Sequence, residues 1–490
     1  MAQPTSGRAR RSARAARGGA ALVATAAAAS AAAVATSSRA DGTIAFTVVG
    51  GAQPRLLRGA AAPAGAAEQV AGAAAAGSHL GSGPVALGAL AGGLVAAGAL
   101  RRGRPRVATA GGRTVAVSQR AGDLEDCPYT VYGSKDIEIT KECSEAADIT
   151  CPLEVQMPPE LKGDLDGQRK YFEDNLPSIY KDLKKHGAVV FRGFELSKES
   201  EGFKKVGQSL ELQPCEDPLH SVAARDAVDK KSGVYEAVNK PSRRKFYVGM
   251  HNEMVGNRAP GAAIFVCFKA AEEGGEFLVA DGRKMFRKLD ADWLEEIYKR
   301  EVRYSTAEFP MGFLDNLPGF VQPAVEPLAY GALRQALNFK VDFDVDLLWE
   351  RSEYDNSKIL QVRAMPQVPV VRHPYTGEPS WWGSMHSHAE YLRREREKVF
   401  GDEGLGDTTG ASRINKTDVY YADNGEKVSV DRLKHLDAVT MESAVPVKMQ
   451  EGDMVLLDNY MVMHGRCPFE GTRKHAVTWF KSPDYSKAAA

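Results

Sequence analysis

His251 and Glu253 stand two residues apart in a mostly apolar stretch that begins near Tyr247. In an extended segment, side chains two residues apart project from the same face. We therefore expect this imidazole and this carboxylate to point in one direction. The pair alone is weak evidence, because a surface pair on an edge strand has the same spacing.

A second histidine and an arginine add to this pair. The run Asp453–Arg466 is apolar and favours β-structure, and it carries His464 near its end. Arg473 follows nine residues later. Two histidines and one carboxylate on one face of a metal leave open positions, an arrangement that suits non-haem Fe(II) and oxygen chemistry. An arginine nearby offers a planar, two-pronged partner for a dicarboxylate cosubstrate.

His-x-Glu, a distant His and then an Arg resemble the Fe(II)/2-oxoglutarate-dependent dioxygenases of the taurine dioxygenase (TauD/TfdA) family. The clavaminate-synthase-like branch is the most similar part of that family. The resemblance covers roughly Leu161 to Lys481. Three further segments match the family in the same order: His186–Phe194, Glu273–Glu276 and His373–Glu378.

The resemblance implies a mainly β fold with flanking helices (α+β), a double-stranded β-helix or jelly roll. It implies that His251, Glu253 and His464 hold Fe(II), and that Arg473 pairs with the 5-carboxylate of 2-oxoglutarate. O2 would be the second cosubstrate. The reaction would be hydroxylation, desaturation or ring closure of a small organic, amino-acid-derived substrate, with release of succinate and CO2. Related halogenases lack the carboxylate, so the presence of Glu253 favours these reactions.

Two positions depart from the family pattern. Phe277 stands where the family commonly has a threonine that bonds the 2-oxoglutarate carboxylate. Val477 stands where taurine dioxygenase has a second arginine, so a sulfonated substrate is disfavoured. Phe277 also leaves open an alternative, a non-catalytic jelly-roll protein that binds a metal or a ligand without turnover. We predict substrate contacts for Tyr247, Phe277 and Trp382.

The first 118 residues differ in composition from the rest. Residues 1–113 hold 13 Arg, no Lys and only two acids, a net charge of +11, and the remainder carries −11. Arg-rich, acid-poor composition is typical of an organelle-targeting segment. Two apolar runs, Ala20–Ala35 and Gly83–Leu100, resemble the bipartite presequences of algal plastids, with a mitochondrial presequence as the alternative. The second run is long enough to cross a bilayer.

This division predicts a targeting presequence over 1–118 and a dioxygenase domain over 119–490. Membrane contact would come only through the presequence. Nucleic acid is not expected as a partner, because phosphate binding needs clustered positive charge and the domain is acidic. The oligomeric state does not follow from the sequence.

Apolar spacing also predicts several elements. Helices are expected over Gln168–Lys185, with Pro177 kinking it or ending a first turn, and over Lys284–Tyr304. Asn338–Asp346 alternates like a half-buried strand. His386 and His388 are expected on one face of another strand, at the substrate rim rather than on the metal. The six cysteines show no zinc spacing and are expected to be reduced thiols.

Overall fold

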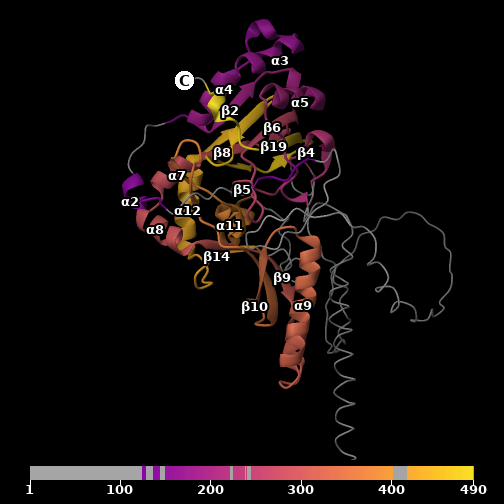
Figure 1. Ribbon diagram of the computed structural model, residues 1–490, viewed down its shortest axis with the longest axis vertical. Coiled ribbons are helices and arrows are strands. Elements are labelled where there is room, and N and C mark those ends of the chain that lie inside the picture. Colours follow the sequence, from indigo (N-terminus) through magenta and orange to yellow (C-terminus); the bar gives the residue numbers. More distant parts are fainter. Residues whose placement is uncertain are drawn as a thin grey trace, which may run out of the picture. The chain divides into compact units, whose positions relative to one another are not determined.

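The computed structural model describes residues 124–128, 136–143, 149–220, 225–237, 239, 244–400 and 417–488 (Figure 1). The predicted presequence, with both of its apolar runs, lies outside these residues. Within them, no helix is both long enough and apolar enough to span a bilayer. All six cysteines are free thiols, as predicted, and the buried Sγ atoms of Cys127 and Cys215 are 2.8 Å apart.

Two β-sheets enclose a common apolar core. The larger sheet has the order β1 (Leu153–Gln156), β2 (Ala188–Arg192), β16 (Met454–Asp458), β6 (Ala262–Lys269), β19 (Lys474–Phe480), β4 (Val234–Glu236), β3 (Ala227–Asp229). The smaller sheet has the order β15 (Ala444–Val447), β8 (Phe277–Asp281), β17 (Val462–Arg466), β5 (Val248–His251). Phe265, Phe277 and Trp479, from β6, β8 and β19, belong to one buried cluster between the sheets. This mixture of helices and strands is consistent with the predicted jelly roll.

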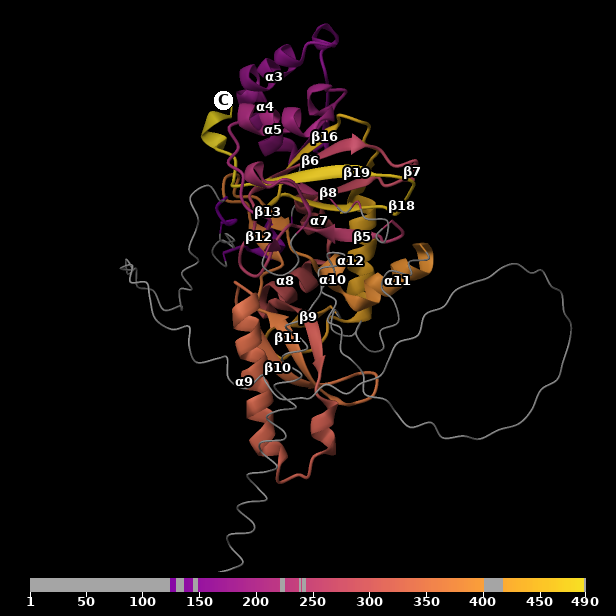
Figure 2. The ribbon, with the colours of Figure 1, turned by 90° about the vertical axis from the view of Figure 1, so that its right-hand side faces the viewer.

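The larger sheet is buried on both faces. Val190 of β2 joins the core between the sheets, whereas its neighbour Val189 joins a second cluster beneath three helices. Those helices are α3 (Leu165–Asp174), α4 (Leu176–His186) and α5 (Ser200–Ser209), and they cover the sheet in Figure 2. Successive strand residues point to opposite faces, which explains why β2 has an unbroken apolar sequence.

A second group of helices covers the outer face of the smaller sheet. These are α7 (Gly282–Lys288), α8 (Ala291–Arg300) and α12 (Val430–Ser443). Trp293 of α8 and Leu436 of α12 pack in one cluster with Leu278 of β8 and Met463 of β17. Met463 therefore points outward, and its neighbour His464 points into the space between the sheets.

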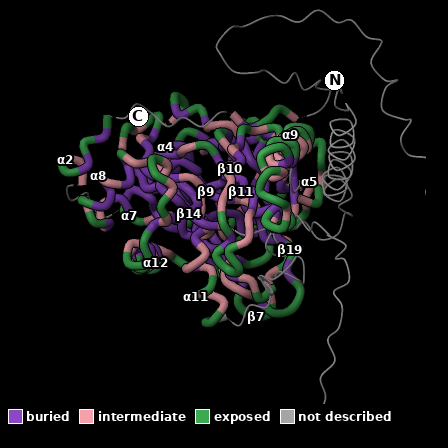
Figure 3. Tube along the Cα trace, turned by 90° about the horizontal axis from the view of Figure 1, so that it is seen from below, coloured by how far each residue is buried: buried purple, intermediate pink, exposed green. Residues whose placement is uncertain are grey.

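A third sheet has its own core. Its strand order is β10 (Val345–Arg351), β11 (Lys358–Ala364), β9 (Val302–Pro310), β14 (Asp418–Tyr421), and helix α9 (Gln322–Lys340) packs on it. Val325 and Leu333 of α9 contact the apolar side chains of these strands. Figure 3 shows exposed and partly buried residues along the rest of α9, whereas β9 and β11 are largely buried.

The remaining elements are short. Two-stranded sheets pair β12 (Val370–Arg372) with β13 (Pro379–Trp381) and β18 (Phe469–Glu470) with β7 (Glu273–Gly274). The other α-helices are α2 (Ile139–Glu142), α10 (Met385–His388) and α11 (Glu390–Phe400). Single 3-10 turns are η1 (Pro159–Leu161), η2 (Leu196–Lys198), η3 (Lys230–Ser232), η5 (Gly312–Asn316) and η7 (Tyr485–Lys487).

Two predicted helices are each divided. Gln168–Lys185 comprises α3 and α4, which meet at Asn175, and Pro177 lies in the first turn of α4, where its missing N–H costs no helical bond. The predicted helix Lys284–Tyr304 is wrong as one element: α7 ends at Lys288, and β9 begins at Val302. The Asp290 carboxylate accepts a hydrogen bond from Trp293 N (2.8 Å) and starts α8 anew.

The run Asp453–Arg466 forms β-structure, as its sequence favours, but as two strands, β16 and β17, which lie in different sheets and are joined by a turn at residues 459–461. Two strand predictions are wrong. Asn338–Asp346 begins with the end of α9, where Phe339 is 91% exposed, and β10 starts only at Val345. His386 and His388 lie on the short helix α10.

Candidate active site

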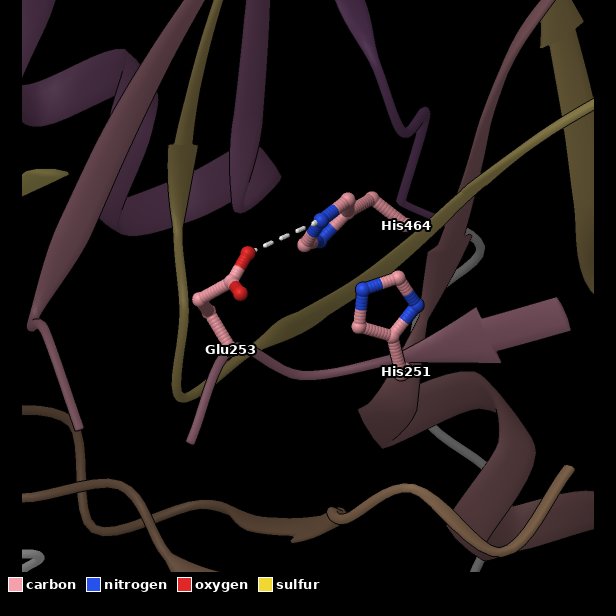
Figure 4. A group of neighbouring side chains, drawn as sticks. All are labelled: His251, Glu253 and His464. Atoms are coloured by element: carbon pink, nitrogen blue, oxygen red, sulfur yellow. Dashed lines mark ion pairs between the residues drawn. The ribbon is translucent and has the colours of Figure 1, made fainter. Parts of the chain in front are cut away.

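His251, Glu253 and His464 come together between the two sheets (Figure 4). His251 ends β5 and pairs in register with His464 of β17, and their ring centroids are 4.4 Å apart. Glu253 follows two residues after His251, and its Oε2 lies 3.6 Å from His464 Nε2. One ligand atom from each residue lies within 4.8 Å of the others. This spacing is compact enough for three ligands of one ion.

Both the protonation and the orientation of these side chains suit a metal. His251 Nδ1 lies 2.8 Å from the carbonyl of Gly249, so Nδ1 carries the proton and Nε2 keeps its lone pair. Burial, and then the nearby His464, lower the pKa of His251 to about 3, so its ring is neutral. Burial opposes ionisation of Glu253, but the Arg225 guanidinium and the histidines hold its pKa well below the ordinary value. His464 Nδ1 is buried without a hydrogen-bond partner among the described residues.

Two buried asparagines fix the chain around Glu253. Asn459 Oδ1 accepts from Glu253 N, and Asn459 Nδ2 donates to the carbonyl oxygens of Glu253 and Pro260, all at 2.8–2.9 Å. Asn252 Nδ2 donates to the carbonyl oxygens of Asn459 and Val462. These bonds join the segment after β5 to the turn between β16 and β17. The backbone that carries Glu253 is therefore fixed by protein contacts.

Two buried arginines, Arg466 on β17 and Arg473 just before β19, form a positively charged group near the histidines. Arg466 follows His464 by two residues on β17, so its side chain shares the inward face, roughly 7 Å along the strand. Arg473 immediately precedes β19 and is 4% exposed. Its Nη1 donates to the carbonyl oxygen of Ala237 (2.8 Å), and its buried Nε has no partner among the described residues.

Arg473 has no carboxylate partner within the described parts of the chain. Burial, followed by repulsion from Arg466, lowers the pKa of Arg473 to about 9. Burial, and then the same two arginines, lower the pKa of His475 well below its ordinary value. A buried cation with an unused donor fits an anionic ligand, because an unpaired buried charge is costly.

Phe277 lies between these two groups. Its ring stacks on His464 at 5.8 Å and 11°, and it contacts Phe265 at 4.7 Å. In register it faces Arg466 across the sheet. The side chain is 3% exposed and so displaces water beside the histidine.

Residues 152–479 match the family described as "Taurine catabolism dioxygenase TauD, TfdA family". The chain belongs to this family. Membership supports an oxygenase activity that depends on Fe(II) and 2-oxoglutarate, and the clustered His251, Glu253 and His464 could hold such an ion. The match spans both sheets, the residues of the metal group and Arg473.

Among individual relatives, the chain is 24% identical to the dapdiamide synthesis protein DdaC of Enterobacter agglomerans over 294 residues, 59% of this chain and 81% of DdaC. A structure of asparagine oxygenase in complex with Fe(II), 3-hydroxyasparagine and succinate is 12% identical, covers 67% of this chain and 93% of that one, and has a TM-score of 0.39. PvcB of Pseudomonas aeruginosa is 12% identical, covers 68% and 87%, and has a TM-score of 0.36.

In this TauD-family chain, two of the predicted substrate residues lie away from the histidines. Tyr247 joins the cluster on the outer face of the smaller sheet and lies under Arg396, whose guanidinium is 4.8 Å from its ring. Trp382 donates to the carbonyl of Asn459 (3.0 Å) and stacks on Tyr460. Their roles in substrate binding stay predictions, whereas Phe277 is beside His464.

His386 supports the ligand strand from behind. Its Nδ1 accepts a hydrogen bond from Met250 N (2.9 Å), next to His251. Burial lowers the pKa of His386 to about 4, so this ring is neutral. His388 Nδ1 lies 3.1 Å from the carbonyl of Ser384, the residue before α10. Neither histidine belongs to the three-residue metal group.

Sequence reasoning missed four residues that shape the site. They are Asn252, Asn459, Asp217 and Arg225. For Asn459 a signal exists, since Asp458-Asn459 is a polar pair within an apolar run, which indicates a turn. Arg225 donates to the carboxylates of Glu253 (2.8 Å) and Asp217 (2.7 Å). Asp217 and Arg225 carry no local signal, because these contacts depend on how distant loops pack.

Proposed function

We propose that this protein is an Fe(II)- and 2-oxoglutarate-dependent oxygenase of the clavaminate-synthase-like branch, built on a double-stranded β-helix. It would hydroxylate, desaturate or cyclise a small, amino-acid-derived molecule. The observation that carries the proposal is the pairing of a preformed His251, Glu253 and His464 group with the buried, uncompensated Arg473. The use of Glu253 rather than aspartate supports the choice of branch.

The residues present fit the proposed ion and cosubstrate. Two imidazoles and a carboxylate are ligands that suit Fe(II) and leave other positions open. When bound, the iron and 2-oxoglutarate would supply the oxidising power, with O2 consumed and succinate and CO2 released. Arg473 would hold the far carboxylate of the cosubstrate through two parallel N–H donors.

The protein itself would position the cosubstrate and exclude water from the site. The strand spacing between His464 and Arg466 sets a short separation between the ligand group and the cationic group. The apolar rings of Phe265 and Phe277 lie beside His464, with ring centroids 4.9 and 5.8 Å from the centroid of its imidazole. Exclusion of water strengthens the electrostatic hold on the cosubstrate and protects a reactive oxidant.

An anaerobic titration tests the proposal. Fe(II) is added to the full-length protein without oxygen, and then 2-oxoglutarate, while the metal-to-ligand charge-transfer absorption is followed. We expect a band in wild type, none in His464→Ala, and a cosubstrate requirement raised by about 100-fold in Arg473→Ala, since losing one partner of a buried charge pair costs roughly 2–5 kcal/mol. His435→Ala and Arg351→Ala, which alter residues outside the site, serve as matched controls.

A folded wild-type protein that binds Fe(II) but shows no band with 2-oxoglutarate would overturn the proposal. That result would favour the binding-protein alternative, with Phe277 closing the cosubstrate position. Restoration of the band in Phe277→Thr would then identify the ring as the obstruction.

The proposed location is a plastid reached through the bipartite presequence, with mitochondria as the alternative. Its support is the Arg-rich, acid-poor composition of residues 1–118 and the two apolar runs within them. Residues 1–118 fused to a fluorescent protein, and examined in algal cells, would distinguish the two organelles.

A further inference from the structure

Arg225 is buried beside the proposed metal group and contacts one of its members. Its Nη2 donates to Glu253 Oε1 (2.8 Å), and its Nη1 donates to Asp217 Oδ1 (2.7 Å). The guanidinium lies 4.4 Å from the ring centroid of Trp479, on β19. Both terminal nitrogens are therefore committed to carboxylates, and one flat face is covered by an indole.

Asp217 fixes this arginine from the other side. The carboxylate is 1% exposed, and its Oδ2 accepts the backbone N–H of Arg225 (2.8 Å), while Oδ1 accepts the N–H of Leu219 (3.0 Å). The backbone and the side chain of Arg225 are thus held by one acid. Rotation of the guanidinium away from Glu253 would break several buried contacts together.

The two carboxylate oxygens of Glu253 have different neighbours because of this contact. Oε1 is taken by Arg225, and Oε2 is the oxygen that faces His464 Nε2 at 3.6 Å. We infer that Arg225 is a positioning residue that restricts Glu253 to ligation of the metal through Oε2 alone. This inference rests on the proposed function, because it presupposes a metal at His251, Glu253 and His464.

One-oxygen ligation has a consequence for the metal. A six-coordinate ion held by two imidazoles and one carboxylate oxygen would keep three positions for other ligands, whereas a two-oxygen carboxylate would leave two. Three positions would suffice for a 2-oxo acid and O2 together. Partners outside the ligand set orient ligands in this way, and losing one typically changes metal affinity about 10–100-fold.

Co(II) binding to the metal-free, full-length protein tests the inference without any turnover. Its ligand-field absorption gains intensity as the coordination number falls, so it reports how Glu253 binds. Arg225→Lys keeps the positive charge but loses the planar guanidinium that donates to two carboxylates at once. We expect this variant to raise the Kd for Co(II) about 10-fold and to alter the spectrum. Arg225→Gln frees Oε1 completely, and we expect the larger spectral change.

Arg283→Gln is the matched control. Arg283 is also a buried arginine with two carboxylate partners, Asp281 at 2.7 Å and Glu378 at 3.1 Å, but it does not contact the metal group. We expect it to lose stability and to keep the wild-type Co(II) spectrum. Wild-type spectra and affinities in both Arg225 variants would overturn the inference alone. Failure of the wild type to bind Co(II) would overturn the proposed function and this inference with it.

Discussion

Two groups lie between the same two sheets: the ligand group, which is His251, Glu253 and His464, and the arginine group, which is Arg466 and Arg473. They differ in how their charges are balanced. Glu253 is paired with Arg225, and Arg225 is also paired with Asp217, before any metal binds. Arg473, in contrast, donates to a backbone carbonyl and an amide oxygen, and no carboxylate among the described residues pairs with it. The charge of Glu253 is balanced by a protein side chain, whereas the charge of Arg473 would be balanced only by a bound anion.

This difference shows which charges of the site are already paired in the folded protein and which are not. In the first group, Glu253 is held by protein contacts, through Asn459 on its backbone and Arg225 on its carboxylate. The arginine group carries an electrostatic cost that an anion would remove. The cosubstrate should therefore stabilise the folded protein by relieving that cost in addition to forming new contacts.

The largest expected effect comes from removing the compensated arginine. Arg225→Met leaves the carboxylates of Asp217 and Glu253 without their shared partner, and we expect the free energy of unfolding to fall by roughly 3–5 kcal/mol. Urea or guanidinium denaturation of the metal-free protein measures it. A decrease below about 1 kcal/mol would mean that Arg225 does not offset the buried charges of Asp217 and Glu253.

An intermediate effect concerns the loop that carries Asp217. His220 Nε2 lies 3.3 Å from Asp342 Oδ2, and this hydrogen bond, opposed by burial, raises the pKa of His220 from 6.5 to about 9. The neighbouring charged groups are Asp126, Glu216 and Arg258. Because the folded pKa is the higher one, the stabilisation is complete below pH 6.5 and is lost as the pH rises through about 9.

We therefore expect wild type to lose roughly 1–3 kcal/mol more than His220→Gln between pH 6 and pH 9.5. Denaturation curves at both pH values measure the difference, and Asp342→Asn should reproduce the behaviour of the His220 variant. Parallel pH profiles for all three proteins would exclude this ion pair as a source of stability.

The smallest expected effect has the opposite sign. Arg473→Met removes a buried cation that lacks a carboxylate partner, so the ligand-free protein should become more stable by about 1 kcal/mol. The increase in melting temperature that 2-oxoglutarate produces in metal-loaded wild type should disappear in this variant. A loss of stability as large as that of Arg225→Met would erase the distinction between the two groups.

Spacing in the sequence predicted the residues that share one strand or one short segment. His251 and Glu253 follow from the two-residue alternation, and the resemblance to the family supplied His464 and Arg473. Arg225 escaped prediction because its partner Glu253 is 28 residues away and its role arises only from packing. The alternation of Phe339, Val341 and Phe343 failed because α9 continues to Lys340, so the helix overrides a local β pattern.

The turn at Asn459 has a consequence for protein synthesis. Asn459 bonds the backbone of Glu253 across 206 residues of chain, and His464 follows only after that turn. A ribosome must therefore complete β16 and β17 before the three ligands can meet, whatever has folded earlier. A metal held by all three residues could therefore be captured only after β17 has been synthesised, and a product truncated before His464 would lack one of the three proposed ligands.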